Sequence, residues 1–293
     1  MREITGRLAN ALGVELIAAE AARPTEHPDA LDYILRGRAV LLKPRTPDAH
    51  REAINLFEHA LALDPKSIEA QGRLAGVLMT SVLAGWAASA SADLARAEGL
   101  VDQALAVSPR LAFAHVVKGH VLRVQRRWEE AIPEYEAALS SNPNWLNSLH
   151  FLAACKMMTG SIEDAISLEQ QAIRLGPRDP YIGNFYFRIG QAHLLLGRTD
   201  EAIVWFEKTA SAIPGFGRLH VWLASAYALK GETERASSEL TEAHRLNYRF
   251  LNIARLKAEG HIGGPGYWGV PKVRALFEAT YFEGLRKAGV PEE

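Results

Sequence analysis

The chain has 293 residues, and its 33 Lys and Arg against 34 Asp and Glu give a formal net charge of −1. This balance provides no overall positive field for phosphate backbones or anionic lipids, which argues against nucleic acid as a partner. One cysteine, Cys155, excludes an internal disulfide. It lies in an apolar segment, where a buried structural thiol is expected, and this fits a cytoplasmic protein.

The first 22 residues predict an amphipathic helix. Charged residues such as Arg7 and Glu15 interrupt the leucines there and break any signal-peptide core. Only residues 74–92 are free of charge for long enough to suggest a membrane span. Glycines and serines recur in that stretch, so it meets the apolar requirement of a bilayer poorly, and no membrane span is expected.

Alanines recur through residues 28–248 at a spacing of 34 residues with two wider steps. A period of this length indicates stacked helical hairpins, in which small residues allow two helices to cross closely. The wider steps predict insertions near 43–47 and 81–93. The six alanines are Ala53, Ala97, Ala131, Ala165, Ala202 and Ala236.

Other residues keep fixed distances from these alanines. A small residue such as Gly119 precedes the alanine on a first helix, and a bulky residue such as Tyr135 follows it on the second. Glu169 is the exception in the bulky slot. Glycine is expected to end the first helix of several hairpins, followed by a hydroxyl residue that caps the second. These pairs are Gly160 with Ser161, Gly197 with Thr199, and Gly231 with Thr233.

The spacing of these residues resembles that of the tetratricopeptide repeat (TPR) family. That family places small residues on its first helix, then an alanine, an aromatic residue, a second alanine and a proline. The resemblance covers residues 28–248 in six units. It implies an all-α fold, a right-handed superhelical solenoid of about six TPR hairpins with a C-terminal capping helix.

A second resemblance is narrower and involves three short segments. The segments 3–9, 83–86 and 282–291 are similar to the C-terminal part of bacterial class III adenylate cyclases. In that family, and in related winged-helix regulators, a cyclase or DNA-binding domain precedes a TolB-like segment and a repeat array. The resemblance implies that residues 1–22 are the last helix of a TolB-like segment, and that the chain is the distal portion of a longer polypeptide or a truncated relative.

Residues 249–293 are expected to form a C-terminal capping region. A glycine-rich turn at 263–269 precedes Pro271, which predicts the start of a helix. The apolar residues that follow have helical spacing and are expected to cap the end of the solenoid. They are Val273, Leu276, Phe277, Tyr281 and Leu285.

The sequence carries no recognisable catalytic constellation. The glycine-rich turn lacks the Lys-Ser/Thr pair of a phosphate-binding loop. His115 and His120 are five residues apart and therefore point to different sides of a helix, whereas a zinc site needs three or four convergent ligands. We therefore expect no catalytic residue, metal or cofactor, and cyclase activity only by association with a separate domain.

The first helices predict a concave groove for an extended peptide or a partner helix. The alternative is that its residues merely tolerate solvent at half-buried positions. No Lys-x-x-x-Asn occurs, which disfavours binding of chaperone tails. The predicted groove residues are Phe113, Val116, His120, Arg123, Asn147, His150, Met157, Asn184, Phe187, Gln191, Leu194, Arg218, Val221 and Ser225.

Three hypotheses follow for the function. The first is a non-catalytic scaffold that binds a protein partner or mediates self-association, as the regulatory tail of a cyclase-like signalling protein. The second is the distal part of an active adenylate or guanylate cyclase whose catalytic domain lies upstream or acts in trans. The third is a structural homo-oligomer that pairs through Trp86 and its apolar insertion.

Overall fold

A computed structural model describes residues 28–42, 46–248, 252–259 and 269–293. Within these ranges every regular element is a helix, as the sequence predicted. The chain divides into two compact units: unit 1 runs to Gln125 and includes residues 140–142, and unit 2 comprises the rest. The predicted helix at residues 1–22 lies outside the described residues, and the proposed division at residues 248 and 249 stays a prediction.

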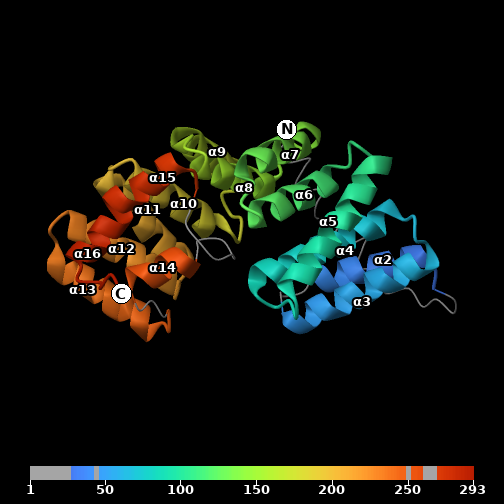
Figure 1. Cartoon of the computed structure of the whole chain (residues 1–293), viewed down its shortest axis with the longest axis horizontal. Helices are drawn as coiled ribbons and strands as arrows, with labels where there is room; N and C mark the ends of the chain where they lie inside the picture. Colours follow the sequence, from blue (N-terminus) through green and yellow to red (C-terminus); the bar gives the residue numbers. More distant parts are fainter. Residues whose placement is uncertain (1–27, 43–45, 249–251, 260–268) are drawn as a thin grey trace. The chain divides into compact units, whose positions relative to one another are not determined.

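Unit 1 consists of helices paired as antiparallel hairpins, α2 with α3 and α4 with α5, followed by α6 (Figure 1). Serine and threonine side chains begin its longer helices: the Thr46 hydroxyl accepts the Ala49 amide at 3.1 Å, ahead of a proline in the first turn of α3. The helices are α2 (Ala30–Leu41), α3 (Pro47–Leu63), α4 (Ile68–Ala84), α5 (Ala90–Val107) and α6 (Ala112–Val124).

Unit 2 begins with α7 and continues with three hairpins, α8 with α9, α10 with α11, and α12 with α13. Their helices are α7 (Trp128–Ser141), α8 (Leu146–Met158), α9 (Ile162–Leu175), α10 (Ile182–Leu195), α11 (Thr199–Ala212), α12 (Gly217–Leu229) and α13 (Thr233–Arg245). The remaining helices are α14 (Ile253–Glu259), α15 (Pro271–Phe277), the π-helical turn η1 (Glu278–Phe282) and α16 (Glu283–Lys287).

The alanine ladder is confirmed as a packing feature. All six ladder alanines are fully buried, each with an exposed fraction of 0%. Small residues on the first helices face the bulky slot: a Cβ at Gly37 would lie 2.6 Å from the Phe57 ring, and one at Gly190 would lie 2.5 Å from the Phe206 ring. Hairpin helices approach this closely because one side of each crossing carries almost no side chain.

The hairpin turns confirm the glycines and correct the caps. Gly160, Gly197 and Gly231 have φ values of 94°, 73° and 80°, in the left-handed region that glycine favours. The capping prediction was wrong, since Ser161 makes no side-chain cap bond to α9. Thr199 and Thr233 are the first residues of α11 and α13. The cap positions are therefore held by Arg198 and Glu232, and neither of these makes a side-chain cap bond.

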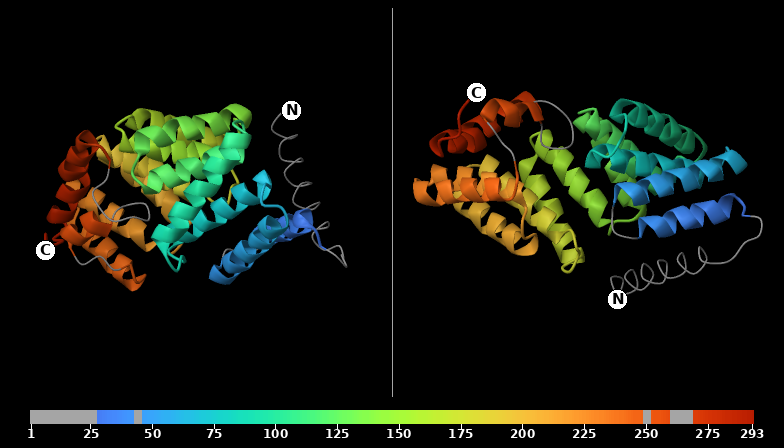
Figure 2. Two further views of the ribbon diagram at one scale, coloured as in Figure 1. Left: turned by 45° about the vertical axis from the view of Figure 1, so that its right-hand side comes forward. Right: turned by 90° about the horizontal axis from the view of Figure 1, so that it is seen from below.

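The C-terminal segment, defined as residues 269–293, packs on unit 2. Pro271 occupies the first turn of α15, as predicted. The turn η1 inserts a residue into the helical repeat, so the neighbouring Tyr281 and Phe282 are both buried. Leu276, which precedes this turn, is only half-buried, unlike the other residues of the predicted apolar stripe. Figure 2 shows this segment in red beside α12, which α16 and η1 contact. The segment therefore contributes to the core of unit 2.

Residues 74–92, the uncharged stretch, form the end of α4 and the beginning of α5. Within the described parts of the chain, the structure contains no helix whose length and apolar character suffice for a membrane crossing.

Candidate partner-binding faces

In unit 1, a row of interacting side chains crosses the three first helices. We call this the unit 1 face and define it by Arg38 on α2, Glu69 and Arg73 on α4, and Phe113 on α6. Arg38 Nη1 donates to Glu69 Oε1 at 3.2 Å, and Arg73 Nη2 lies 3.5 Å from the same oxygen. The Arg73 guanidinium lies 4.7 Å from the centroid of the Phe113 ring. One continuous chain of contacts thus links the three helices.

Glycines on α4 make room for Phe113. A Cβ at Gly76 would lie 2.8 Å from the ring, and one at Gly72 would lie 3.6 Å from it. Because these positions lack side chains, the Phe113 ring packs close to the α4 backbone, and the Arg73 guanidinium lies over the ring. Phe113 is half-buried. The unit 1 face therefore combines an aromatic surface with charged groups that water still reaches.

Further along α6, the predicted groove residues differ in exposure. Val116 and Arg123 are buried, with exposed fractions of 5% and 3%, whereas His120 is half-buried. Burial lowers the pKa of His120 well below its ordinary range, and the positive charge of Arg123 adds to this effect. His120 is therefore neutral at pH 7 and offers a hydrogen bond rather than a charge.

In unit 2, helices α8, α9 and α10 contribute to a polar cluster centred on the buried Glu169. His150 Nδ1 on α8 lies 2.7 Å from Glu169 Oε1 on α9, and Arg188 Nε on α10 lies 3.9 Å from that oxygen. Arg188 Nη1 in turn donates to Gln191 at 3.4 Å. Burial raises the pKa of Glu169 well above its ordinary range, an effect that the Arg188 charge partly opposes. This contact with His150 accounts for a carboxylate in a slot that is otherwise bulky and apolar.

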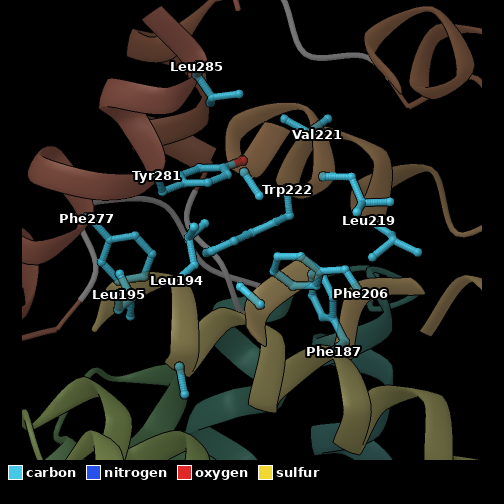
Figure 3. Packing of buried hydrophobic residues seen from close by; sticks show 14 of the residues in the cluster. Phe187, Leu194, Leu195, Phe206, Leu219, Val221, Trp222, Phe277, Tyr281 and Leu285 are labelled. Carbon is cyan, nitrogen blue, oxygen red and sulfur yellow. The ribbon is translucent and has the colours of Figure 1, made fainter. Parts of the chain in front are cut away.

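Another part of the first-helix surface in unit 2, on α10 and α12, packs against the C-terminal segment. We call the surface of α10 and α12 that carries Leu194, Val221 and Ser225 the unit 2 face. All three residues have an exposed fraction of 0%. Ser225 Oγ donates to the Tyr281 carbonyl at 2.8 Å, and the Trp222 and Tyr281 rings stack with centroids 4.0 Å apart. Figure 3 shows the Tyr281 ring beside Trp222.

The C-terminal segment is also fixed at its start. Val270 N donates to the Met158 carbonyl at 2.9 Å, at the end of α8. Near its other end, Gly284 lies so close to α12 that a Cβ there would approach the Ser225 carbonyl oxygen to 2.4 Å. The C-terminal segment is therefore fixed to unit 2 near both of its ends and through the stack of Tyr281 on Trp222 between them.

The predicted groove residues thus fall into two classes. Those that water reaches are Phe113, His120, Asn147, His150, Asn184 and Arg218. Those that are buried are Val116, Arg123, Met157, Phe187, Gln191, Leu194, Val221 and Ser225. Phe187 belongs to the core, since its ring centroid lies 5.8 Å from that of Phe206 and 6.0 Å from that of Trp222. It is therefore a packing residue in the observed arrangement.

Arg38, Glu69 and Arg73 are not among the residues predicted for the groove. The predicted register begins only at Gly119, because the insertions interrupt the spacing of the first two repeats. The signal was nevertheless present: Gly37 on α2 faces its hairpin partner α3, Gly76 on α4 faces the next first helix α6, and the arginines lie one to three positions from these glycines.

The described residues contain no group of three or more His, Cys, Asp or Glu side chains arranged to hold a metal ion.

Comparison with known proteins agrees with the hairpin architecture. The tetratricopeptide repeat family matches residues 82–145 and 116–180, and a second match to a tetratricopeptide repeat covers residues 183–215. The chain is 27% identical over 122 residues to the photosystem I assembly protein Ycf3 of Prochlorococcus marinus, covering 39% of this chain and 70% of that protein. It is 29% identical over 133 residues to the putative adenylate cyclase 3 of Rhizobium meliloti, covering 44% of this chain but only 22% of the cyclase.

Among solved structures, the Cut9–Hcn1 hetero-tetramer of the APC/C contains a similar chain. The TM-score is 0.66 at 16% sequence identity, and the match covers 82% of this chain and 44% of that one. Identity at this level speaks for the fold alone. Together with the consecutive packing of hairpins, these matches show that the chain contains tetratricopeptide repeats stacked as an all-α solenoid.

Proposed function

We propose that the chain is a non-catalytic scaffold that binds a protein or peptide partner through its first-helix surfaces. The observation that supports this most directly is the unit 1 face, where half-exposed aromatic and charged side chains run across three consecutive first helices. Apolar anchors accompanied by a few polar groups are the composition that extended peptides and partner helices require. In unit 2, His150, Asn184 and Arg218 offer a smaller solvent-accessible set.

A random peptide library displayed on phage tests this proposal. The full chain is expected to enrich a family of related peptides, and Phe113→Ser is expected to remove that enrichment while helical content by circular dichroism is retained. Val204→Ser is the control, because Val204 is 49% exposed on the second helix α11. Equal enrichment by wild type and Phe113→Ser would count against the unit 1 face, and loss with both variants would indicate a non-specific effect.

The finer part of the proposal is that this scaffold is the regulatory tail of a cyclase-like signalling protein in the cytoplasm. Support comes from the 29% identity to the putative adenylate cyclase 3. The alternative is the distal part of an active cyclase whose catalytic domain lies upstream or acts in trans. Sequencing the coding DNA upstream of Met1 separates them: a continuous frame with the paired aspartates of a cyclase domain supports the alternative, and a stop codon ahead of Met1 excludes a catalytic domain in the same polypeptide.

A third possibility, self-association, rests on Trp86. This residue is 36% exposed, and its ring packs edge-on against His50 with centroids 4.8 Å apart. A partly exposed tryptophan is a common anchor at protein interfaces. Light scattering is expected to show a dimer that Trp86→Ser disrupts, and a monomer across the accessible concentration range would exclude this mode.

A further inference from the structure

The unit 1 face contains an unbalanced charge cluster. Arg38 and Arg73 both approach one carboxylate oxygen, Glu69 Oε1, at 3.2 and 3.5 Å. Two guanidinium groups therefore share one anion, and the cluster carries a net charge of +1. Arginine donates through a planar fork that accommodates carboxylates in pairs of hydrogen bonds. Each guanidinium group has five N–H donors, so the two arginines can together bind another carboxylate in addition to Glu69.

Partial burial of the two arginines increases the effect of this unbalanced charge. The side chains of Arg38 and Arg73 are 28% and 29% exposed, so each is partly withdrawn from water. Burial lowers the pKa of Arg73, and the positive charge of Arg38 lowers it further. A partly desolvated cation that also faces a like charge is stabilised when another anion arrives. A partner that supplies such an anion gains more here than on an open surface.

The neighbouring aromatic ring indicates what else the partner provides. Phe113 lies against Gly72 and Gly76, with the Arg73 guanidinium 4.7 Å from its centroid. An anion bound between the arginines is therefore adjacent to an apolar surface. Inorganic phosphate and nucleic acid backbones offer charge without an apolar group at this distance, whereas an acidic peptide offers both. The net charge of −1 on the whole chain also provides no general attraction for polyanions.

We propose that the unit 1 face binds an acidic peptide segment, with one carboxylate held between Arg38 and Arg73 and an adjacent apolar side chain against Phe113. Glu69 competes with the bound carboxylate for the two guanidinium groups. This inference rests on the proposed scaffold function, because it names the chemistry of the partner at the same face.

Fluorescence anisotropy with the full chain and three labelled peptides tests the proposal. The probes are ten-residue peptides of one apolar pattern in which the intervening positions are all Glu, all Gln or all Lys. The Glu peptide is expected to bind at least about tenfold more tightly than the Gln peptide, since a charge-assisted hydrogen bond contributes roughly a factor of ten in affinity. Raising the salt concentration is expected to reduce this preference.

Variants of the charge cluster are expected to change the affinity for the Glu peptide in opposite directions. Arg38→Gln and Arg73→Gln are each expected to weaken binding of the Glu peptide about tenfold. Glu69→Gln is expected to strengthen it, because the competing carboxylate is removed. Arg96→Gln is the matched control: Arg96 pairs with Glu58 at 2.6 Å between α5 and α3, so this variant loses the same charge and the same kind of pair on second helices. Its affinity is expected to remain that of the wild type.

Four results would overturn the proposal. They are weaker binding by Glu69→Gln, an equal loss in Arg96→Gln, equal affinity for the Glu and Gln peptides, and displacement of the Glu peptide by equimolar inorganic phosphate. If the wild-type chain binds the Glu and Gln peptides equally and Phe113→Ser abolishes binding of both, the scaffold function stands and only the acidic preference fails. If none of the three peptides binds while the phage library still yields peptides that depend on Phe113, the scaffold function again stands and only the acidic preference fails.

Discussion

The two units carry the same repeat but differ in what covers their first-helix surfaces. In unit 2, Val221 and Ser225 are fully buried, and the C-terminal segment packs there through a hydrogen bond from Ser225 to Tyr281 and the stack of Tyr281 on Trp222. In unit 1, Arg73 and Phe113 also lie on first helices but remain accessible to water. A first-helix position is therefore not a binding position by virtue of its place in the repeat. Whether it binds a partner depends on what the chain itself has placed there.

The largest effect is expected where the C-terminal segment enters the core of unit 2. Tyr281 is 2% exposed and its ring lies 4.0 Å from that of Trp222, so Tyr281→Ala leaves a large cavity. The free energy of unfolding is expected to fall by about 3–5 kcal/mol. Urea denaturation followed by circular dichroism measures this loss.

Tyr181→Ala is the control for that substitution, because Tyr181 is 41% exposed. A loss in Tyr281→Ala no greater than in this control would show that the C-terminal segment is not part of the unit 2 core, and the contrast between the two faces would disappear.

A smaller effect with opposite signs is expected for two helical glycines, one in each unit. At Gly284 a Cβ would lie 2.3 Å from Ser225 Oγ and 2.4 Å from its carbonyl oxygen. Gly284→Ala therefore forces α16 away from α12, at a cost of about 1–3 kcal/mol. At Gly99 on α5 nothing lies within 4 Å of the added Cβ, so Gly99→Ala is expected to stabilise its helix by roughly 0.5–1 kcal/mol.

Thermal unfolding of the two variants compares them directly. A lower melting temperature for Gly284→Ala and a higher one for Gly99→Ala are expected. If both variants melt above the wild type, α16 does not approach α12 as closely as the structure has it.

The sequence predicted the internal packing well but not which surface the C-terminal segment covers. The alanine ladder and the turn glycines follow from local rules, since a hairpin crossing needs a small residue wherever it occurs. The apolar stripe around Phe277 and Tyr281 has helical spacing, which shows which side of a helix is apolar but not which surface it meets. The π-helical turn at Glu278–Phe282 also changes the register by one residue, and periodicity alone does not reveal this.

The candidate site was predictable only in part. Phe113 and His120 follow from the repeat register, which is intact on α6. Arg38 and Glu69 lie on helices whose spacing the insertions disturb, and the contact between them joins positions 31 residues apart in the sequence. Such a pair becomes visible only once the stacking of α2 and α4 is known.

The polar cluster of unit 2 predicts a pH dependence of stability. Burial raises the pKa of Glu169 well above its ordinary value of 4.5, and the groups that face it are His150 and Arg188. The folded state therefore holds this proton more tightly than the unfolded state. The resulting stability is present below pH 4.5 and is lost as the pH rises through the folded-state pKa. Glu169→Gln keeps a neutral side chain at every pH, so its melting temperature is expected to rise relative to wild type as the pH increases from 4.5.

Glu239→Gln is the matched control for this trend. Glu239 also accepts from a histidine, with His220 Nδ1 2.6 Å from Oε2, but its side chain is 23% exposed to water. The difference in melting temperature between Glu239→Gln and wild type is expected to change less over the same pH range. Parallel curves for both variants would mean that burial of Glu169 is not the cause.

The smallest effect on folding is expected at the unit 1 face. The pair between Arg38 and Glu69 joins side chains that are 28% and 44% exposed, so water competes for both groups and salt screens their attraction. Arg38→Gln is expected to change the free energy of unfolding by only about 0–1 kcal/mol. Urea denaturation at low and high salt measures this change, with Arg96→Gln as the matched control on second helices. A loss as large as that in Tyr281→Ala would make Arg38 a structural residue like those of the unit 2 face. A small loss of stability in Arg38→Gln, together with weaker binding of the acidic peptide, would show that the unit 1 face serves a partner. The unit 2 face, in contrast, serves the packing of the chain itself.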